Sequence, residues 1–516
     1  MLTRTPADAA RVTADVVVIG GGGSGLAAAI EAASLGRRVV LIEKNDRLGG
    51  TTGRSIGSVT ASNTPHQIRH GIKDSPDHHY EDLAKFNAAL GLADNDKLSR
   101  MLVENVPDTF RWLMDLGIEF YGPMKELPHR KPRMHNVLPN SKAYIYHLER
   151  RARKLRVDVR TSTRARELIR RDGRVDAVLC DTPNGSVEFQ AKGGIVLATG
   201  DYSGSAEMRR DLVSDAIGKV EPINPTNTGD GHRMVLALGG RILNPHVHLA
   251  GIRFQPPQTS WVAKLPPYPW FTRLMRLSLE HLPGWLLRPF ILSFLTTVLV
   301  PTPKLFKNGA LLINGNGERF TDELEDLADP LSRQPDRKGY ILLDGSLVDK
   351  FSSWPNYVST APGVAYAYIA DYRRSRKDVF KEAGSLGELA SRIGADPARL
   401  EKTVADYRAE IEGQPLETNR LTRTPFDRGP YVALGPVRYW INFTDGGVAV
   451  NERLEVVGAD DRPLGGLYAA GFIGMGGILL EGHGHHLGWA FTSGRIAGRH
   501  AAWAAVSEDL PEAAGT

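Results

Sequence analysis

The chain has 516 residues, 41% hydrophobic and 24% charged, so it can bury a large core and a wholly disordered protein is excluded. The formal charge of +5 comes from Lys and Arg residues scattered among nearly as many acids, which argues against a nucleic-acid partner. A single cysteine, Cys180, leaves no intrachain disulfide, no thiolate metal site and no redox-active dithiol. Residues 1–15 lack the apolar run of a signal peptide, and we expect a cytoplasmic protein.

The first predicted element is a strand over residues 14–19 (ADVVVI), because a short β-branched apolar run is typical of a strand buried on both faces. Gly20, Gly22 and Gly25 follow it, with the spacing that allows a tight turn, a close approach to a pyrophosphate and tight helix packing. The Ala-rich stretch 26–34 then predicts a helix whose first amides face the phosphates. This order of elements predicts a dinucleotide-binding site.

A second strand is predicted over 38–42, with Glu43 at its end in the position of a carboxylate that binds ribose hydroxyls. Lys44 follows, and then comes a second loop of small residues over 47–53. Nicotinamide enzymes have little use for such a loop, whereas it can wrap the pyrophosphate and ribityl chain of FAD. From this loop we predict three FAD contacts: Gly50, Thr51 and Thr52.

Three later segments extend the nucleotide site. Residues 194–200 form an apolar strand ending at Gly200, and 228–240 form a turn and helix that contain Asp230. Residues 466–471 form a last strand ending at Gly471, and a helix that includes 492–498 follows. We expect Gly200, Asp230, Gly471 and, before the last helix, Leu487 to contact a dinucleotide held by both ends of the chain.

These blocks, in this order, resemble the fumarate reductase and succinate dehydrogenase flavoprotein superfamily, and in character its 3-ketosteroid dehydrogenase-like branch. The similarity spans nearly the whole chain and includes 385–404 (SLGELASRIGADPARLEKTV), which resembles a helical segment of the family's cap. The resemblance implies an α/β fold in which residues 1–245 and 427–516 form a Rossmann-type FAD-binding domain. An α+β capping domain, residues 246–426, is inserted between them. It also implies hydride transfer between flavin N5 and a carbon next to a carbonyl.

Several positions depart from the family pattern. The stretch 319–323 (RFTDE) matches the start of a motif, but no arginine follows in 324–327, where the resemblance places a proton donor. Asn442 replaces a histidine, and His486 replaces an arginine that binds dicarboxylates in the family. A dianion would therefore meet acids where it needs cations, so the sequence argues against fumarate and succinate as substrates.

The form of the cofactor and its electron partner also follow from the resemblance. The loop 49–57 has no histidine for covalent attachment, so non-covalent FAD is expected. Phe472 replaces the acid that usually follows the last strand. Because no second glycine fingerprint provides an NAD(P)H domain, electrons must be exchanged with a separate carrier, a quinone or a redox protein.

An apolar insertion occupies residues 261–306, with three tryptophans and interspersed basic residues. The segment 285–300 is too short for a bilayer crossing, which takes about 20 apolar residues. One interpretation is a peripheral contact with the inner face of the membrane or a substrate gate. The other is packing within the cap or between chains. Both place a hydrophobic surface near the site and favour a lipophilic substrate.

The candidate catalytic residues are His485, His486 and Tyr121. The two histidines follow the last FAD strand, where the family places substrate-binding groups, and imidazole exchanges protons near neutral pH. Tyr121 lies one residue from the position where 3-ketosteroid 1-dehydrogenases have an active-site tyrosine. Backbone hydrogen bonding remains an alternative role for the histidines, and core packing for the tyrosine. We expect no metal, because no cysteine accompanies the histidines.

The sequence thus predicts an FAD-dependent oxidoreductase that desaturates or reduces a carbon-carbon bond next to the carbonyl of a lipophilic ketone, such as a 3-ketosteroid. Desaturation is the favoured direction. One alternative is an FAD-binding electron-transfer subunit of a larger redox assembly. The other is reduction of a small unsaturated acid, which needs a cationic pocket that the sequence motifs do not provide.

Overall fold

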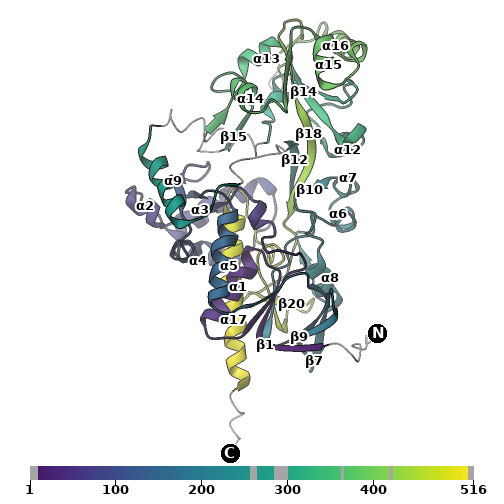
Figure 1. The fold of residues 1–516 in the computed structure, drawn as a ribbon. Helices are drawn as coiled ribbons and strands as arrows, with labels where there is room; N and C mark the ends of the chain where they lie inside the picture. Colours follow the sequence, from purple (N-terminus) through teal and green to yellow (C-terminus); the bar gives the residue numbers. More distant parts are fainter. Residues whose placement is uncertain (1–9, 256–263, 284–299, 362–364, 418–421, 510–516) are drawn as a thin grey trace, which may run out of the picture.

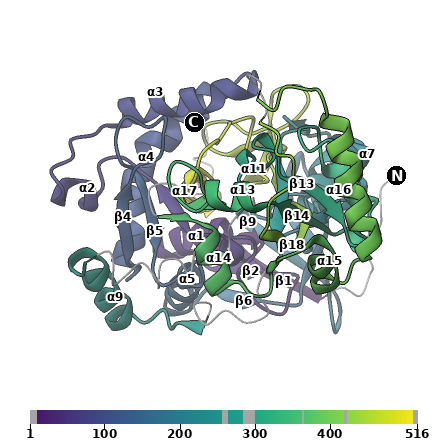
Figure 2. The same ribbon diagram turned by 90° about the horizontal axis from the view of Figure 1, so that it is seen from above.

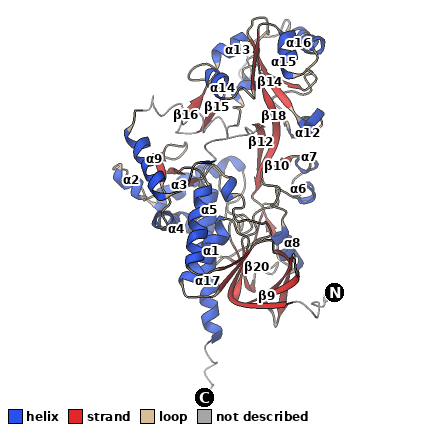
Figure 3. Cartoon of the chain, in the orientation of Figure 1, coloured by secondary structure: helices blue, strands red, loops and turns tan. Residues whose placement is uncertain are grey.

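The chain is elongated, with one sheet near the two chain ends and a second sheet at the opposite end of the molecule (Figure 1). A computed structural model gives its structure. It describes residues 10–255, 264–283, 300–361, 365–417 and 422–509. Figure 3 shows that helices and strands alternate in both parts, so the fold is mixed α/β.

The first sheet has a parallel centre. Its main path runs in the order β20 (Glu455–Val457), β21 (Pro463–Ala469), β9 (Gly185–Leu197), β1 (Ala10–Ile19), β2 (Val39–Ile42) and β6 (Asp158–Arg160). All neighbours from β21 to β6 are parallel. An antiparallel ribbon of β7 (Arg164–Arg171) and β8 (Arg174–Thr182) joins at β9. The apolar run predicted as a strand forms the carboxyl-terminal part of β1, and all of it except Asp15 is buried, as is usual for parallel strands.

Helices cover this sheet. The chief ones are α1 (Gly23–Ser34), α5 (Lys142–Lys154), α8 (Asp230–Ala237) and the long last helix α17 (His485–Asp509). Two glycines allow α17 to lie directly on α1. A Cβ atom at Gly494 would lie 2.3 Å from the Ser24 carbonyl oxygen, and one at Gly498 would lie 2.3 Å from that of Ala28. The first and last helices are therefore in backbone contact.

A small sheet lies beside these helices, in the order β3 (Ser58–Thr60), β5 (Met134–Val137) and β4 (Phe120–Met124). Three helices accompany it: α2 (Pro65–Arg69), α3 (Pro76–Asn87) and α4 (Asp96–Asp115). Figure 2 shows α2, α3 and α4 gathered on one side of the molecule together with β4 and β5. Because β3 pairs with β5, the loop after β2 is connected to this layer.

The second sheet has its own buried apolar cluster. Its strands are β10 (Glu221–Pro222), β12 (His248–Phe254), β13 (Leu311–Asn314), β14 (Gly339–Leu343), β17 (Phe380–Ala383) and β18 (Tyr431–Thr444). Its helices are α12 (Ala328–Ser332), α13 (Gly345–Lys350), α14 (Ile369–Ser375), α15 (Leu386–Ile393) and α16 (Pro397–Ile411). The last two occupy the stretch 385–404, which the sequence predicts to be helical. β12 and β18 pair antiparallel and run between the two parts of the molecule (Figure 1).

Short elements complete the described chain. Two small ribbons are β11 (Ile242–Leu243) with β19 (Gly447–Val448) and β15 (Ser359–Ala361) with β16 (Ala365–Ala367). The remaining helical turns are α6 (Ala206–Leu212), α7 (Asp215–Gly218) and α11 (Lys304–Lys307).

The apolar insertion is described only in part, because 261–263 and 284–299 lie outside the described residues. Its described helix, α9 (Pro269–His281), packs against β4 and is tied there by Arg276, which donates to Glu119 at 2.7 Å. Trp270 and Leu274 are 68% and 57% exposed. Within the described residues, no helix combines the length and the hydropathy that a bilayer crossing requires.

Candidate active site

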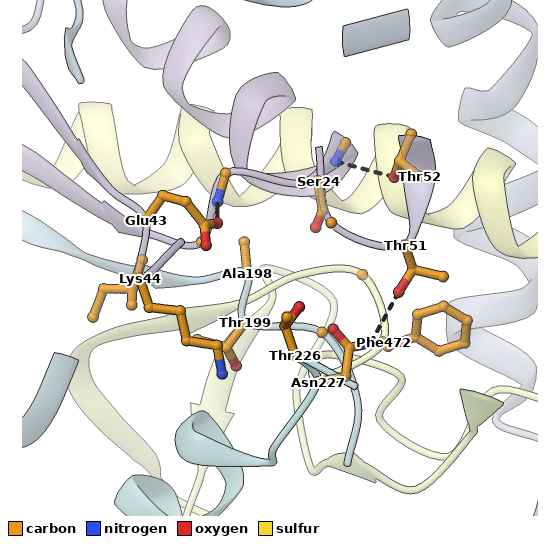
Figure 4. A pocket seen from close by; sticks show the side chains of 18 of the residues that line it. Ser24, Glu43, Lys44, Thr51, Thr52, Ala198, Thr199, Thr226, Asn227 and Phe472 are labelled. Atoms are coloured by element: carbon orange, nitrogen blue, oxygen red, sulfur yellow. Dashed lines mark hydrogen bonds between the residues drawn. The ribbon is translucent and has the colours of Figure 1, made fainter. Parts of the chain in front are cut away.

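A cleft opens at the carboxyl ends of β1, β2 and β9, the edge of a parallel sheet where ligands usually bind. Its empty volume is about 1060 Å³. The glycine loop, the end of β2, the loop around Thr51 and the loop around Asn227 form its walls (Figure 4). These segments come from four separate regions of the sequence.

Three glycines have three different roles in this cleft. Gly20 has φ of 111°, which favours glycine in the turn after β1. A Cβ atom at Gly25 would lie 1.8 Å from the Gly20 carbonyl oxygen, so only glycine lets α1 approach the strand so closely. A Cβ atom at Gly22 would meet nothing within 4 Å, although Gly22 lines the cleft. The open space in front of Gly22 and the amides of α1 is suited to a pyrophosphate.

Glu43 is buried at the end of β2. Its Oε2 accepts a hydrogen bond from the Gly21 amide at 2.8 Å, and its Oε1 accepts from the Asn45 amide at 2.8 Å. The carboxylate thus holds the glycine loop in place while it lines the cleft. Lys44, the next residue, donates from Nζ to Asp230 Oδ2 at 2.8 Å, which ties the end of β2 to the start of α8.

The second predicted loop packs directly onto the first. Thr52 Oγ1 accepts a hydrogen bond from the Gly23 amide at 3.1 Å. Thr51 Oγ1 accepts from Asn224 Nδ2 and Asn227 Nδ2, both at 2.9 Å. Neither asparagine could be predicted as part of this site, because neither belongs to a short motif.

The remaining predicted contacts also line the cleft. They are Gly50, Gly200, Asp230, Gly471 and Leu487. Gly471 has φ of 70°, and a Cβ atom there would lie 2.6 Å from Ser24 Oγ. The carboxyl-terminal loop therefore closes on the start of α1, so the cleft is formed by both ends of the chain.

Comparison with known proteins agrees with this geometry. A family model described as an FAD binding domain matches residues 15–259 and 281–478. The chain belongs to this flavoprotein family. The protein is a member of the FAD-dependent fumarate reductase and succinate dehydrogenase flavoprotein superfamily, and FAD is its cofactor.

A relative with a curated description is the NADH:fumarate oxidoreductase of Klebsiella pneumoniae, 29% identical over 91% of this chain. The chain spans only 45% of that relative's length. Two solved structures show the same fold. The open conformation of a flavocytochrome c3 fumarate reductase gives a TM-score of 0.72 at 24% identity, covering 97% of this chain and 80% of the other. The 3-ketosteroid-Δ4-(5α)-dehydrogenase of Rhodococcus jostii RHA1 gives 0.60 at 22% identity, covering 97% and 98%. The flavoprotein is thus an FAD-dependent oxidoreductase of the fumarate reductase family.

One end of the cleft of the flavoprotein holds His486 in an aromatic setting. Its ring lies 4.4 Å from the ring of Phe443 and stacks on Phe472 at 5.2 Å. Its Nε2 hydrogen-bonds to Oδ1 of the buried Asp445 at 2.9 Å. Asp445 directly follows β18, so the strand from the second sheet positions this carboxylate. The other ring nitrogen, Nδ1, has no hydrogen-bond partner among the described residues.

His485, the neighbouring residue, points away from the cleft. It is fully buried, with Nδ1 donating to the Glu481 carbonyl oxygen at 2.7 Å and Nε2 lying 3.2 Å from His79 Nε2. Burial lowers its pKa to about 4. Two consecutive residues at the start of α17 project in different directions, which explains why only one of them reaches the cleft. In this structure His485 has a core position.

His485 belongs to a cluster of three buried histidines, with His79 and His129. One ring nitrogen of each could bind a metal ion, and these three atoms lie within 4.8 Å of one another. Arg133 Nη1 lies 2.9 Å from His129 Nδ1, and since a guanidinium only donates, that nitrogen must accept. His129 Nε2 must then carry the hydrogen, because burial lowers the pKa of His129 to about 2 and keeps the ring neutral. With one lone pair used and a cation adjacent, the cluster favours hydrogen bonds among neutral rings over a metal ion.

Tyr121 lies on β4 and lines a different cavity, together with Glu126, His129 and Glu280. Burial raises its pKa, and the negative charge of Glu280 adds to the increase. Its place opposite Asn136 on β5 fixes the side chain at this second cavity. It does not line the FAD cleft.

A histidine–carboxylate pair that was not predicted lies in the loop before α17. His483 Nδ1 is 2.5 Å from Glu126 Oε1, and the His483 amide also donates to this carboxylate at 3.2 Å. The hydrogen bond with Glu126 raises the pKa of His483. Glu126 is buried whereas His483 is partly exposed, so the pair can exchange a proton with its surroundings.

Proposed function

We propose that this flavoprotein oxidises or reduces a carbon-carbon bond next to the carbonyl group of a lipophilic ketone, such as a 3-ketosteroid, with desaturation as the favoured direction. The observation that carries the proposal is the aromatic, carboxylate-bound imidazole of His486 at the end of the cleft. The resemblance places a dicarboxylate-binding arginine at this position. An imidazole packed against two phenyl rings suits an uncharged carbonyl better than a carboxylate.

FAD, when bound, supplies the hydride acceptor or donor. The chain supplies proton handling and orientation. Asp445 accepts the Nε2 hydrogen of His486, which fixes the tautomer in which Nδ1 carries no hydrogen. Nδ1 is then free to take a proton from the substrate during desaturation or to return it during reduction. Phe443 and Phe472 keep the ring in place and exclude water from one side.

The proposal extends to the architecture. Residues 1–245 and 427–516 act as a Rossmann-type FAD-binding domain, and 246–426 act as a capping domain. The parallel order of β1, β2 and β9 and the separate apolar cluster of the second sheet support this division. Electrons leave to a separate acceptor, a quinone or a redox protein.

Anaerobic flavin absorbance tests the function. The purified holoprotein is titrated with a panel of 3-ketosteroids and, after reduction with dithionite, with fumarate. We expect a ketosteroid to bleach the flavin. His486→Gln and Asp445→Asn should slow the bleaching by about 10²- to 10⁴-fold without loss of FAD, whereas His78→Gln, an exposed residue on α3, should have no effect. Reoxidation by fumarate alone would overturn the ketone proposal.

A second candidate, reduction of a small unsaturated acid, is favoured by the Klebsiella relative named for fumarate. The fumarate titration tests it directly. A third, an electron-transfer subunit without its own substrate, predicts that neither compound changes the flavin spectrum. These outcomes separate the three functions in one experiment.

A further inference from the structure

One face of the β12–β18 ladder carries polar groups without partners. Side chains alternate along a strand, so Arg438 and Trp440 of β18 lie on one face, and Asn442 follows them at a β-bulge, where the register with β12 shifts. Directly opposite, on β12, Arg253 pairs with Arg438 in register and Gly251 with Trp440. The neighbours on the other face, such as Ile252 and Ile441, are buried in apolar clusters.

The unpartnered atoms along this face are an indole, an amide and a guanidinium. Trp440 Nε1 and Asn442 Oδ1 are buried and have no hydrogen-bond partner among the described residues. Arg253 is half-buried, and within that same part of the chain nothing forms an ion pair or hydrogen bond with it. Arg438, in contrast, donates to Glu221 at 2.7 Å. Burial lowers the pKa of Arg253, as expected for a cation that lacks a counter-charge.

Open space adjoins this row. A Cβ atom added at Gly251 would meet no atom of the described residues within 4 Å, although Gly251 is two residues from Arg253 on β12 and directly opposite Trp440 on β18. Native structures leave few buried polar groups unsatisfied, and each one calls for an explanation. An indole N–H, an amide oxygen and a guanidinium that have no partner among the described residues are best explained by a ligand.

The row leads to the cofactor cleft. Phe443, the residue after Asn442, lines the cleft, and Arg438 is five residues before it. At about 3.4 Å per residue, Arg253 opposite Arg438 lies about 17 Å along the strand from Phe443. That length exceeds a small diacid and corresponds to a molecule with several fused rings and a side chain.

We propose that this row, Arg253 with Trp440 and Asn442, binds the distal part of the substrate, and that the substrate is a lipophilic ketone with a carboxylate at the end remote from the reacting bond. The inference rests on the proposed function and names its substrate class. The carboxylate accepts hydrogen bonds from the guanidinium of Arg253 and the indole N–H of Trp440, and Gly251 leaves room for the substrate.

The test compares two steroids that differ only in charge. They are 3-oxo-4-cholen-24-oic acid and its methyl ester, each used for flavin bleaching under anaerobic conditions with the holoprotein. We expect the acid to be used with kcat/KM at least tenfold above that of the ester. Arg253→Gln should abolish this preference by raising KM for the acid about 10- to 100-fold, with kcat little changed, because the contact is remote from the reacting bond. Arg253→Lys should keep part of the preference for the acid over the ester, because the positive charge is kept.

Gly251 provides a matched pair of steric variants. Gly251→Leu fills the open space and should raise KM for both steroids, whereas Gly251→Ala should have a small effect. The Cβ of either variant meets no atom of the described residues within 4 Å. Urea unfolding of each variant verifies that the fold is retained. Use of both steroids by Gly251→Leu with unchanged KM would overturn the placement of the substrate along this face.

Calorimetric binding of the acid separates the inference from the proposed function. Equal use of acid and ester by the original protein and by Arg253→Gln overturns the inference and leaves the ketone function standing. Binding of the acid that is lost in Arg253→Gln, without flavin bleaching, supports the anionic site and overturns the ketone function. If the acid neither binds nor bleaches the flavin, both the inference and the proposed function are overturned.

Discussion

Substitutions of two neighbouring glycines should separate cofactor binding from folding. Gly22→Ala places a methyl group in the open space of the cleft, whereas Gly25→Ala places one 1.8 Å from the Gly20 carbonyl oxygen. A carbon normally approaches a carbonyl oxygen to about 3.3 Å, so Gly25→Ala creates an overlap of about 1.5 Å. Both atoms belong to rigid backbone positions, and no side-chain rotation relieves the contact.

The expected magnitudes follow from these distances. Overpacking costs about 1–3 kcal/mol in a close-packed core, and we expect the upper end for Gly25→Ala. Replacing glycine by alanine in a helix returns up to about 1 kcal/mol, which leaves a net loss of about 2 kcal/mol in the free energy of unfolding. For Gly22→Ala the change should stay within about 0.5 kcal/mol, since nothing is displaced. Its methyl group instead removes a charge-assisted hydrogen bond to the pyrophosphate, worth about 1.5–3 kcal/mol, or about 10- to 100-fold in Kd.

Two measurements on the deflavinated protein test this. Urea unfolding gives the free energy of unfolding of each variant, and quenching of FAD fluorescence gives Kd. Gly22→Ala should be as stable as the original chain but bind FAD more weakly, whereas Gly25→Ala should lose both. Unchanged FAD affinity in a folded Gly22→Ala variant would refute the placement of the pyrophosphate at Gly22.

Two further predictions concern pH. Burial alone would raise the pKa of Asp82, but hydrogen bonds from Lys85, Arg133 and Arg130 lower it. The stabilising effect of the Asp82 carboxylate is therefore present above the unfolded pKa of about 3.9 and is lost as pH falls below that value. Asp82→Asn should therefore cost about 3–5 kcal/mol in urea unfolding at pH 7, because it leaves a buried arginine under-compensated, and the deficit should shrink in acid. The pKa of His483 is raised by Glu126, so this pair stabilises the fold fully below about pH 6.5 and loses that effect as pH rises through the raised pKa. In Glu126→Gln the imidazole signal of His483 should titrate at a lower pH by NMR, and an unchanged titration would contradict the pairing.

The nucleotide-binding half could be predicted because its signals are local. The positive φ of Gly20 belongs to the turn itself, and the closest contact of Gly25 is with Gly20, five residues earlier. Strands β1 and β2 and helix α1 lie where the apolar runs predict them, with ends shifted by a few residues. Each element has a strong pattern of its own, so no distant contact was needed to recognise it.

The carboxylate partners of His486 and His483 could not be predicted, because they come from distant segments. Asp445 is 41 residues from His486, and Glu126 is 357 residues from His483. A carboxylate in a loop carries no sign of which imidazole it will meet. Tyr121 and His485 show the converse: their residue types suit catalysis, but the register of β4 and the start of α17 turn them away from the cleft.

The contact between α1 and α17 determines when the cofactor can be captured during synthesis. Gly494 and Gly498 lie against Ser24 and Ala28, more than 460 residues earlier in the chain, and the loop before α17 forms one wall of the cleft. A ribosome must therefore release α17 before the amino-terminal segment finds its partner, although that segment emerged first. We therefore expect stable FAD binding only in chains that have been translated through α17. Truncated chains should remain colourless even when most of their sheets have formed.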